Sequence, residues 1–251
     1  MSHSKKAKDE PSNQSQHIIR TEGLTKQFGG LTAVDDVTYQ MPYGEINCLI
    51  GPNGAGKSTF FKMLAGQLRP TDGRIIFKDE DITELQPHER ARRGLSIKFQ
   101  DVNVYPELSV RENLRIPVQR YEQDEDIAGA IDEFLALIDL EEESTSEVGQ
   151  LSHGQQQWLE IAIATAIEPD LLLLDEPTAG MSIEETKNTG ELIQSLATQG
   201  MSVIVVEHDI TFVEQIAERV TVLHNGAIFA EGTVDEIKAN KDVQKIYLGG
   251  E

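Results

Sequence analysis

One stretch decides the fold of this chain of 251 residues: Gly51-Pro52-Asn53-Gly54-Ala55-Gly56-Lys57-Ser58-Thr59. It has the spacing G-x-x-x-x-G-K-[ST] of a phosphate-binding loop, and it follows an apolar run, Ile46–Ile50. A loop of this kind joins a strand to a helix, and its backbone N–H groups point into one concavity that surrounds phosphate oxygens. We therefore predict a helix over residues 57–66 and an α/β fold that binds a nucleoside triphosphate.

Each part of the loop has a chemical role. Lys57 is placed to reach the β- and γ-phosphates, and the Ser58 hydroxyl can complete the octahedral shell of a Mg²⁺ ion. The positive end of the following helix also faces the phosphates. The loop residues that we expect to contact the nucleotide are Gly51, Asn53, Gly54, Gly56, Lys57, Ser58 and Thr59.

A second motif is Leu171-Leu172-Leu173-Leu174-Asp175-Glu176-Pro177. Four leucines predict a short strand buried on both faces, with two carboxylates at its carboxyl end, where ligands bind in open α/β sheets. We expect Asp175 to hold Mg²⁺ opposite Ser58 and Glu176 to polarise an attacking water. Taken alone, Asp-Glu-Pro is also typical of a loop that follows any buried strand.

Strands and helices alternate along the rest of the chain, which predicts a largely parallel, covered sheet. Amphipathic helices are expected over residues 127–140 and 183–197, and a polar, disordered tail over residues 1–17. A helical insertion is predicted over about residues 101–166. The strands that we expect, besides Ile46–Ile50, span residues 73–77, 171–175, 202–207, 219–223 and 227–230, the last two joined by an Asn225-Gly226 turn.

The composition of the chain limits the kinds of partner that we expect it to bind. Asp and Glu number 43 against 22 Lys and Arg, a formal charge of −21, which argues against nucleic acid and against direct docking on anionic lipid. The charge suits either ordinary solubility or a high-salt cytoplasm. A single cysteine, Cys48, is compatible with a reducing compartment. No apolar run reaches the roughly 18 residues of a membrane-spanning helix, so a role at the membrane would require a partner.

The third motif is Leu151-Ser152-His153-Gly154-Gln155. Ser152 and Gln155 have capping-box spacing, which by itself predicts only the start of a helix. The order of the features is more specific: a phosphate loop, Gln100, this Leu-Ser-x-Gly-Gln stretch, the Asp-Glu strand and then His208. This order resembles the ATP-binding subunit of ABC (ATP-binding cassette) transporters, over nearly the whole chain from Ile18 to Gly249.

The resemblance implies a P-loop NTPase (RecA-like) core with an antiparallel β-subdomain and an inserted helical subdomain, within a cassette spanning residues 18–251. It implies two cassettes packed head to tail, with ATP and Mg²⁺ between them. By position, Phe28 matches the aromatic residue that stacks on adenine, although a lone aromatic residue there is as often structural. Gln100 matches a residue that contacts Mg²⁺ and the attacking water, and His208 one that contacts the γ-phosphate. The residues expected to serve the partner's ATP are Ser152, Gly154 and Gln155.

Two positions depart from the family pattern. His153 stands where the signature has glycine, and Ser182 stands where many cassettes carry aspartate. The stretch Leu-Ser-His-Gly-Gln followed by Gln157-Trp158-Leu159-Glu160-Ile161, then Ala179-Gly180-Met181, resembles the urea-import branch of the branched-chain amino acid transporter cassettes. The ending Val243–Gly249 is similar to that of the same group. That subgroup implies a second cassette in a heterodimer, two transmembrane permease subunits and an external solute-binding protein, with the chain at the cytoplasmic face of the membrane.

The alternatives are a soluble ATPase of assembly complexes, such as iron–sulfur cluster scaffolds, and a nucleotide-gated binding module. Val104 and Tyr105 are expected either in a permease-docking patch or in the core.

Overall fold

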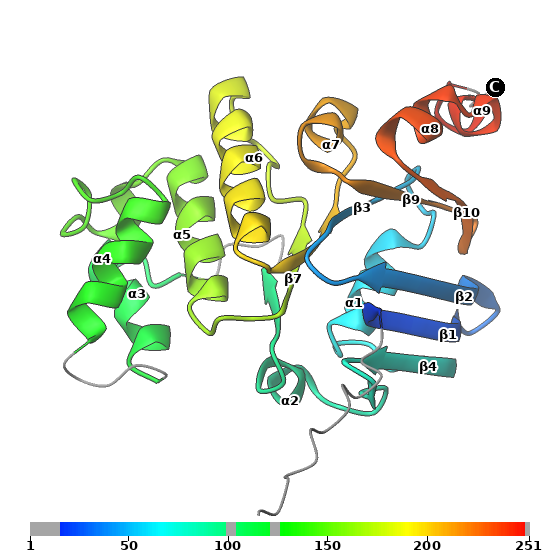
Figure 1. Ribbon diagram of the computed structural model, residues 1–251, viewed down its shortest axis with the longest axis horizontal. Helices are drawn as coiled ribbons and strands as arrows, with labels where there is room; N and C mark the ends of the chain where they lie inside the picture. Colours follow the sequence, from blue (N-terminus) through cyan, green and yellow to red (C-terminus); the bar gives the residue numbers. More distant parts are fainter. Residues whose placement is uncertain (1–15, 99–103, 121–125, 249–251) are drawn as a thin grey trace, which may run out of the picture.

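Two β-sheets and the helices around them make up the computed structural model, which describes residues 16–98, 104–120 and 126–248 (Figure 1). The larger sheet has the strand order β10-β9-β3-β8-β7-β6, and its strands are parallel except for β10, which pairs antiparallel with β9. Its strands are β3 (Ile46–Ile50), β6 (Leu95–Lys98), β7 (Leu171–Asp175), β8 (Ser202–Val206), β9 (Arg219–His224) and β10 (Ala227–Gly232).

The smaller sheet is antiparallel and has the order β2-β1-β4-β5. Its strands are β1 (His17–Phe28), β2 (Leu31–Pro42), β4 (Asp72–Phe77) and β5 (Glu80–Asp81). In Figure 1 this sheet lies on one side of α1, and the helices α3, α4 and α5 lie at the opposite end of the molecule. The predicted α/β fold, with an antiparallel sheet beside a parallel core, is therefore confirmed.

The helices are α1 (Lys57–Leu64), α2 (Pro87–Ala91), α3 (Val110–Val118), α4 (Ile127–Leu137), α5 (His153–Thr165), α6 (Ile183–Thr198), α7 (Ile210–Ile216), α8 (Val234–Ala239) and α9 (Lys241–Leu248), with a 3₁₀ turn at Val148–Gln150. Within the described residues, none of them combines the length and the apolar character that crossing a membrane requires.

Two apolar clusters cover the two faces of the parallel sheet. In β7, Leu172 and Leu174 belong to the cluster shared with α3, α4, α5, α6 and α7, whereas Leu171 and Leu173 belong to the cluster shared with α1 and the antiparallel sheet. Successive strand residues point to opposite faces, so a strand covered on both sides needs apolar residues throughout. This packing explains the unbroken leucine run.

Several predicted boundaries were wrong by a few residues. The helix predicted over residues 57–66 ends at Leu64, because Gly66 takes a left-handed conformation (φ 77°). The helix predicted over residues 127–140 ends at Leu137, because Asp139 is also left-handed (φ 55°). The predicted tail overlaps β1 at His17. The predicted helical insertion contains α3, α4 and α5, which share one apolar cluster with the sheet.

Candidate nucleotide site

The phosphate loop joins β3 to α1, as the spacing predicts. Gly56 precedes the helix in a left-handed conformation (φ 102°), and a Cβ atom there would collide with the carbonyl oxygen of Ala33 in β2. Only glycine tolerates both conditions without strain. The antiparallel sheet therefore packs directly against the loop and fixes its shape.

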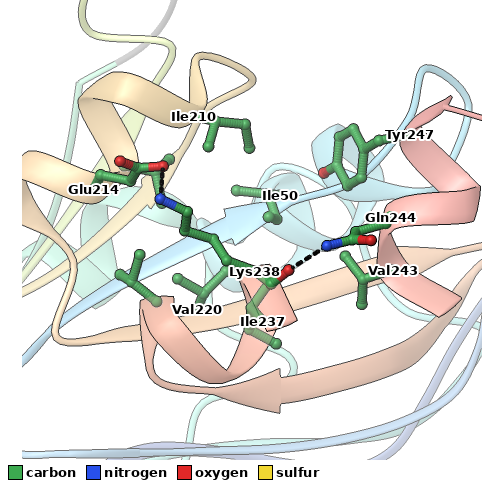
Figure 2. Close-up of a pocket in the computed structure, with 11 residues that line it drawn as sticks. Ile50, Ile210, Glu214, Val220, Ile237, Lys238, Val243, Gln244 and Tyr247 are labelled. Atoms are coloured by element: carbon green, nitrogen blue, oxygen red, sulfur yellow. Dashed lines mark hydrogen bonds and ion pairs between the residues drawn. The ribbon is translucent and has the colours of Figure 1, made fainter. Parts of the chain in front are cut away.

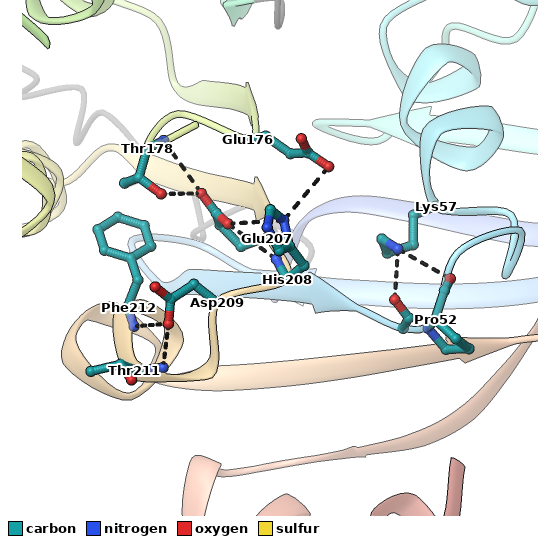
Figure 3. A network of polar contacts seen from close by, with 10 residues as sticks. Pro52, Lys57, Glu176, Thr178, Glu207, His208, Asp209, Thr211 and Phe212 are labelled. Carbon is teal, nitrogen blue, oxygen red and sulfur yellow. Dashed lines mark hydrogen bonds and ion pairs between the residues drawn. The ribbon is translucent and has the colours of Figure 1, made fainter. Parts of the chain in front are cut away.

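Lys57 is buried at the start of α1 and is 8% exposed. Its Nζ atom donates to the carbonyl oxygens of Gly51 (2.6 Å) and Pro52 (3.2 Å), as Figure 3 shows. Burial lowers the pKa of Lys57, and the nearby carboxylates of Glu176 and Asp175 oppose that shift. The ammonium group is thus held inside the loop by two of the loop's own carbonyl oxygens.

Asp175 ends β7, and Glu176 follows it at the carboxyl edge of the sheet. Glu176 has a left-handed backbone (φ 46°) and its N–H donates to the carbonyl oxygen of Val206 in β8 at 2.9 Å. A non-glycine residue in this conformation costs about 1–3 kcal/mol, and such strain is concentrated at functional sites. The strained turn directs the Glu176 side chain toward the edge where the phosphate loop lies.

A polar network fixes the loops after β7 and β8 relative to each other (Figure 3). Glu207, only 1% exposed, accepts from the Thr178 hydroxyl (2.7 Å) and from the Thr178 N–H (3.3 Å). Its other carboxylate oxygen accepts from the backbone N–H of His208 at 3.1 Å. Sequence reasoning missed Glu207, although a carboxylate at the end of an apolar strand, just before His208, is the kind of signal that could have identified it.

His208 itself is largely exposed, and its Nδ1 atom lies 3.8 Å from Oε1 of Glu176. Asp209 caps α7 by accepting from the N–H groups of Thr211 (2.8 Å) and Phe212 (3.3 Å). Glu207 and the cap at Asp209 therefore hold the backbone on both sides of His208. The imidazole projects from a fixed loop toward the Glu176 carboxylate.

The electrostatics of the site fit a divalent cation. Burial raises the pKa of Asp175, and the neighbouring carboxylate of Glu176 raises it further, against Lys62 and Lys98. A cation would relieve this repulsion. Within residues 16–98, 104–120 and 126–248, no three His, Cys, Asp or Glu side chains cluster as a metal centre. Mg²⁺ that is bound together with a nucleotide needs only one or two protein carboxylates, and Asp175 offers one.

The remaining predicted residues lie in three places. Phe28 ends β1, is 46% exposed, and has Nζ of Lys26 5.3 Å from its ring centroid. Gln100 lies outside the described residues. Ser152, Gly154 and Gln155 lie at the start of α5, which Figure 1 places across β7 from α1 and the phosphate loop. The structure thus gathers the loop, Asp175, Glu176 and His208 in one region and places the signature residues elsewhere.

Both departures from the family pattern have defined contacts. The Nε2 atom of His153 lies 3.1 Å from the carbonyl oxygen of Ala179, so this side chain joins the start of α5 to the loop after β7. Ser182 caps α6, and its hydroxyl accepts from the N–H of Glu185 at 3.3 Å. Serine and aspartate are both good N-caps, so this replacement preserves the start of the helix.

A separate apolar pocket of about 260 Å³ lies between α7, β9, α8 and α9 (Figure 2). Ile50, Ile210 and Ile237 line it, and its rim carries an ion pair between Lys238 and Glu214 (2.8 Å). Because its lining is mostly apolar, it does not suit phosphates. The pocket nevertheless touches the nucleotide region, since Ile50 directly precedes the phosphate loop.

A phosphate loop after one parallel strand, with paired carboxylates at the end of another strand of the same sheet, defines a P-loop ATPase. Sequence comparison is more specific. The pattern of the ABC transporter family matches residues 34–179, and that of the branched-chain amino acid ATP-binding cassette transporters matches residues 227–251. The chain belongs to the ABC transporter family and is one of its ATP-hydrolysing cassettes.

Individual relatives span nearly the whole chain. The high-affinity branched-chain amino acid transport ATP-binding protein BraF of Pseudomonas aeruginosa is 36% identical over 252 residues, which cover 94% of this chain and 99% of BraF. The lipopolysaccharide export system ATP-binding protein LptB of Acidithiobacillus ferridurans is 35% identical over 240 residues, 92% and 97% of the two chains.

Solved structures agree with the fold. A nucleotide-free ATP-binding cassette from an ABC transporter superposes with a TM-score of 0.84 at 29% identity and covers 93% of this chain and 99% of its own. A dimeric ATP-binding cassette, MJ0796, bound to ADP and phosphate after hydrolysis, superposes with a TM-score of 0.76 at 27% identity and covers 86% and 98%.

Proposed function

We propose that this chain is the ATP-hydrolysing subunit of a membrane transporter that imports branched-chain amino acids. The observation that carries the proposal is the match of residues 227–251, beyond the nucleotide-binding core, to the branched-chain amino acid cassettes. BraF, named for transport of these amino acids, supports it over the full length. The similar identity of LptB means that the cassette core by itself does not identify the cargo.

The site fits ATP and Mg²⁺. The loop closes around the Lys57 ammonium group, and a Cβ atom at Gly51 or Gly56 would collide with backbone carbonyl oxygens, which keeps the loop tightly curled. The buried carboxylate of Asp175, with its raised pKa, is the charge that a cation would compensate. We assign Asp175, with the hydroxyl of Ser58 and the amide oxygen of Gln100, as the residues that hold the ion.

In this mechanism Mg²⁺ withdraws charge from the phosphates when it is bound. Lys57 exchanges its bonds to Gly51 and Pro52 for phosphate oxygens and orients the transferred group. Glu176 accepts a proton from the attacking water and holds that water in line. His208, fixed through the Glu207 network, donates to the γ-phosphate and keeps the Glu176 side chain in place. Phe28, Asn53, Gly54 and Thr59 complete the nucleotide contacts.

The position of the signature residues favours a pair of cassettes. Ser152, Gly154 and Gln155 lie at the start of α5, and Figure 1 shows α5 on the other side of β7 from α1, so we assign them to the ATP bound by the partner. The solved dimeric cassette MJ0796, bound to ADP and phosphate, supports a pair of cassettes. Shifting such a pair from mostly open to mostly closed takes about 5.5 kcal/mol of differential binding. Several charge-assisted contacts of about 1.5–3 kcal/mol each are enough to supply that energy.

We assign the other partners by the same reasoning: a second cassette, two permease subunits, and an external solute-binding protein that delivers the amino acid. The chain then sits at the cytoplasmic face of the membrane. Tyr105, 57% exposed, is the candidate contact with a permease. The Asn113 side chain bonds its backbone N–H and carbonyl oxygen, so the exposed ring projects from a fixed backbone. Val104 is partly buried against the core and contributes less to that surface.

The test is to tag the chain in its native cell, solubilise the membranes gently and identify what co-purifies. We expect two polytopic membrane proteins and a second cassette. Uptake of labelled leucine, with labelled urea as the comparison solute, should then fail in cells that carry Glu176→Gln in place of the normal chain. Recovery from the soluble fraction with assembly factors would contradict the proposal and favour the assembly ATPase. Loss of urea uptake alone would keep the importer but change its cargo.

A further inference from the structure

The carboxylate of Glu185 bridges the N-termini of two helices. One oxygen, Oε2, accepts from the backbone N–H of Ser182 at 2.9 Å and completes the capping box of its own helix, α6. The other oxygen, Oε1, accepts from the hydroxyl of Ser152 at 3.2 Å, and Ser152 is the N-cap of α5. A side chain of α6 therefore occupies the start of the signature helix.

Gly154 shows how close this approach is. A Cβ atom built on Gly154 would collide with the Glu185 carboxylate. The carboxylate consequently lies directly over the first turn of α5, where backbone N–H groups have no partner within the helix and where the helix dipole is positive. It is an anion that accepts from the N-cap hydroxyl at the positive end of the α5 dipole.

The carboxylate remains charged in this position. The pKa of Glu185 is lowered, first because the N–H and the hydroxyl of Ser182 bond to it, and further because the Ser152 hydroxyl donates to it. His153 adds a smaller electrostatic contribution of the same sign.

This arrangement has a consequence that rests on the proposed function, in which Ser152 and Gly154 receive the γ-phosphate held by the partner. A carboxylate and a phosphate are both anions, and one set of donors cannot serve both. We propose that Glu185 occupies the phosphate position of the signature in the open cassette, and that its withdrawal from Ser152 is a required step of ATP-driven closure. Glu185 is thus a positioning residue that makes ATP-driven closure of the dimer less favourable.

The geometry allows this withdrawal without unfolding α6. The two oxygens of Glu185 have separate partners, so the start of α6 does not depend on the contact with Ser152. The Ser182 hydroxyl also bonds the Glu185 N–H from the opposite direction. The cap of α6 therefore holds the backbone while the carboxylate changes partner.

The experiment measures ATP-dependent dimerisation in a Glu176→Gln background, in which the closed dimer should accumulate. The chain is mixed with the second cassette recovered as above, or used alone if the dimer is homomeric, and the dimer fraction is followed by sedimentation. Glu185→Gln keeps a side chain that can complete a capping box but removes the charge. We expect the dimer dissociation constant at saturating ATP to fall about tenfold, which corresponds to about 1.4 kcal/mol.

A matched control exists in α3, where Glu112 completes the same capping box with Ser109. Glu112→Gln should leave dimerisation unchanged, which separates the signature contact from the general effect of neutralising a capping carboxylate. Glu185→Asp is a second variant: it keeps the charge and can still cap, but is too short to reach Ser152 as well. We expect it to tighten the dimer as Glu185→Gln does.

Three results would overturn the inference. Dimerisation of Glu185→Gln equal to that of its parent would mean that the carboxylate does not compete with ATP. Weaker dimerisation would mean that it supports the closed state. If the Glu176→Gln parent itself stays monomeric at saturating ATP, the proposed dimer is wrong, and the inference is rejected with it. The parent thus distinguishes failure of the proposed function from failure of the role given to Glu185.

Discussion

Nδ1 of His208 lies 3.8 Å from Oε1 of Glu176, although the two residues follow different strands of the parallel sheet. The contact exists because β7 and β8 are neighbours in register, with Asp175 opposite Val206. Glu207 and Thr178 then tie together the loops that follow these strands. The proposed general base and the proposed γ-phosphate contact are therefore held as one unit.

The first prediction concerns Glu176. Glu176→Gln keeps the size of the side chain but removes the proton acceptor, so we expect ATP turnover to fall by at least about 100-fold. ATP affinity should stay close to that of the parent, because the phosphate loop is unchanged. Phosphate release and equilibrium nucleotide binding, measured on the same preparation, check both parts. Normal turnover would remove Glu176 from the mechanism.

Lys57→Ala should act on binding itself. Lys57 is the buried cation inside the phosphate loop, and a lost charge-assisted bond costs about 1.5–3 kcal/mol, or more than about tenfold in ATP affinity. Lys62→Ala, an exposed lysine of the same helix, is the control and should bind ATP nearly normally. Fluorescent-nucleotide titration compares the two variants. Equal affinities would mean that the loop does not hold the phosphates.

Gly56→Ala tests the shape of the loop. The new Cβ atom would meet the carbonyl oxygen of Ala33 in a left-handed conformation, so we expect a loss of about 1–3 kcal/mol in the free energy of unfolding and weakened ATP binding. Gly30→Ala is the matched control, because a Cβ atom there meets open space and needs no left-handed φ. Denaturant unfolding measures both. Similar midpoints would argue that the loop relaxes around the added methyl group.

The raised pKa of Asp175 predicts a pH-dependent stability without nucleotide. The pKa of Asp175 is higher in the folded than in the unfolded protein, so the folded state binds the proton more tightly. The stability of the folded protein therefore falls as the pH rises from the unfolded-state pKa through the folded-state pKa. Asp175→Asn should therefore raise the melting temperature at neutral pH, and the difference should shrink toward about pH 4, near the ordinary pKa of an aspartate.

At neutral pH, Mg²⁺ and ADP should reverse the order of the two melting temperatures, so that the normal chain melts at a higher temperature than Asp175→Asn. The ionised carboxylate then has a cation to compensate it, so the normal chain should gain more thermal stability from the ligands than Asp175→Asn does. If Asp175→Asn melts at the same temperature as the normal chain at every pH, without ligands, the electrostatic account of this site is wrong.

Tyr105→Ala tests the permease contact. Asn113, 1% exposed, bonds both the N–H and the carbonyl oxygen of Tyr105, so loss of the exposed ring should leave the fold and the ATPase activity of the isolated cassette intact. Recovery of permeases should fall strongly, because aromatic anchors at interfaces contribute about 2 kcal/mol or more. Tyr43→Ala, at another exposed tyrosine, is the control. Full recovery of permeases with Tyr105→Ala would place the docking surface elsewhere.

The sequence by itself determined the features that depend on only a few neighbouring residues. The phosphate loop, the buried strand Leu171–Asp175 and the turn at Asn225-Gly226 each follow from residue type and spacing, since glycine conformations and strand periodicity act within a few residues. Strands β1, β2, β5 and β6 escaped prediction, and β5 has only two residues. β6 has only four residues, and β1 and β2 mix buried with exposed residues because one of their faces meets solvent.

Only the tertiary structure decided which distant groups meet. Strand order brought Glu176 to His208, and the packing of the antiparallel sheet placed Ala33 against Gly56. The contact of Glu185 with Ser152 likewise depends on how two helices pack, and each helix alone shows only an ordinary capping box. Capping patterns and apolar periods specify where an element begins and which face it buries. Which other helix or strand an element packs against depends on burying all the apolar faces of the chain at once, and no short stretch of sequence specifies that.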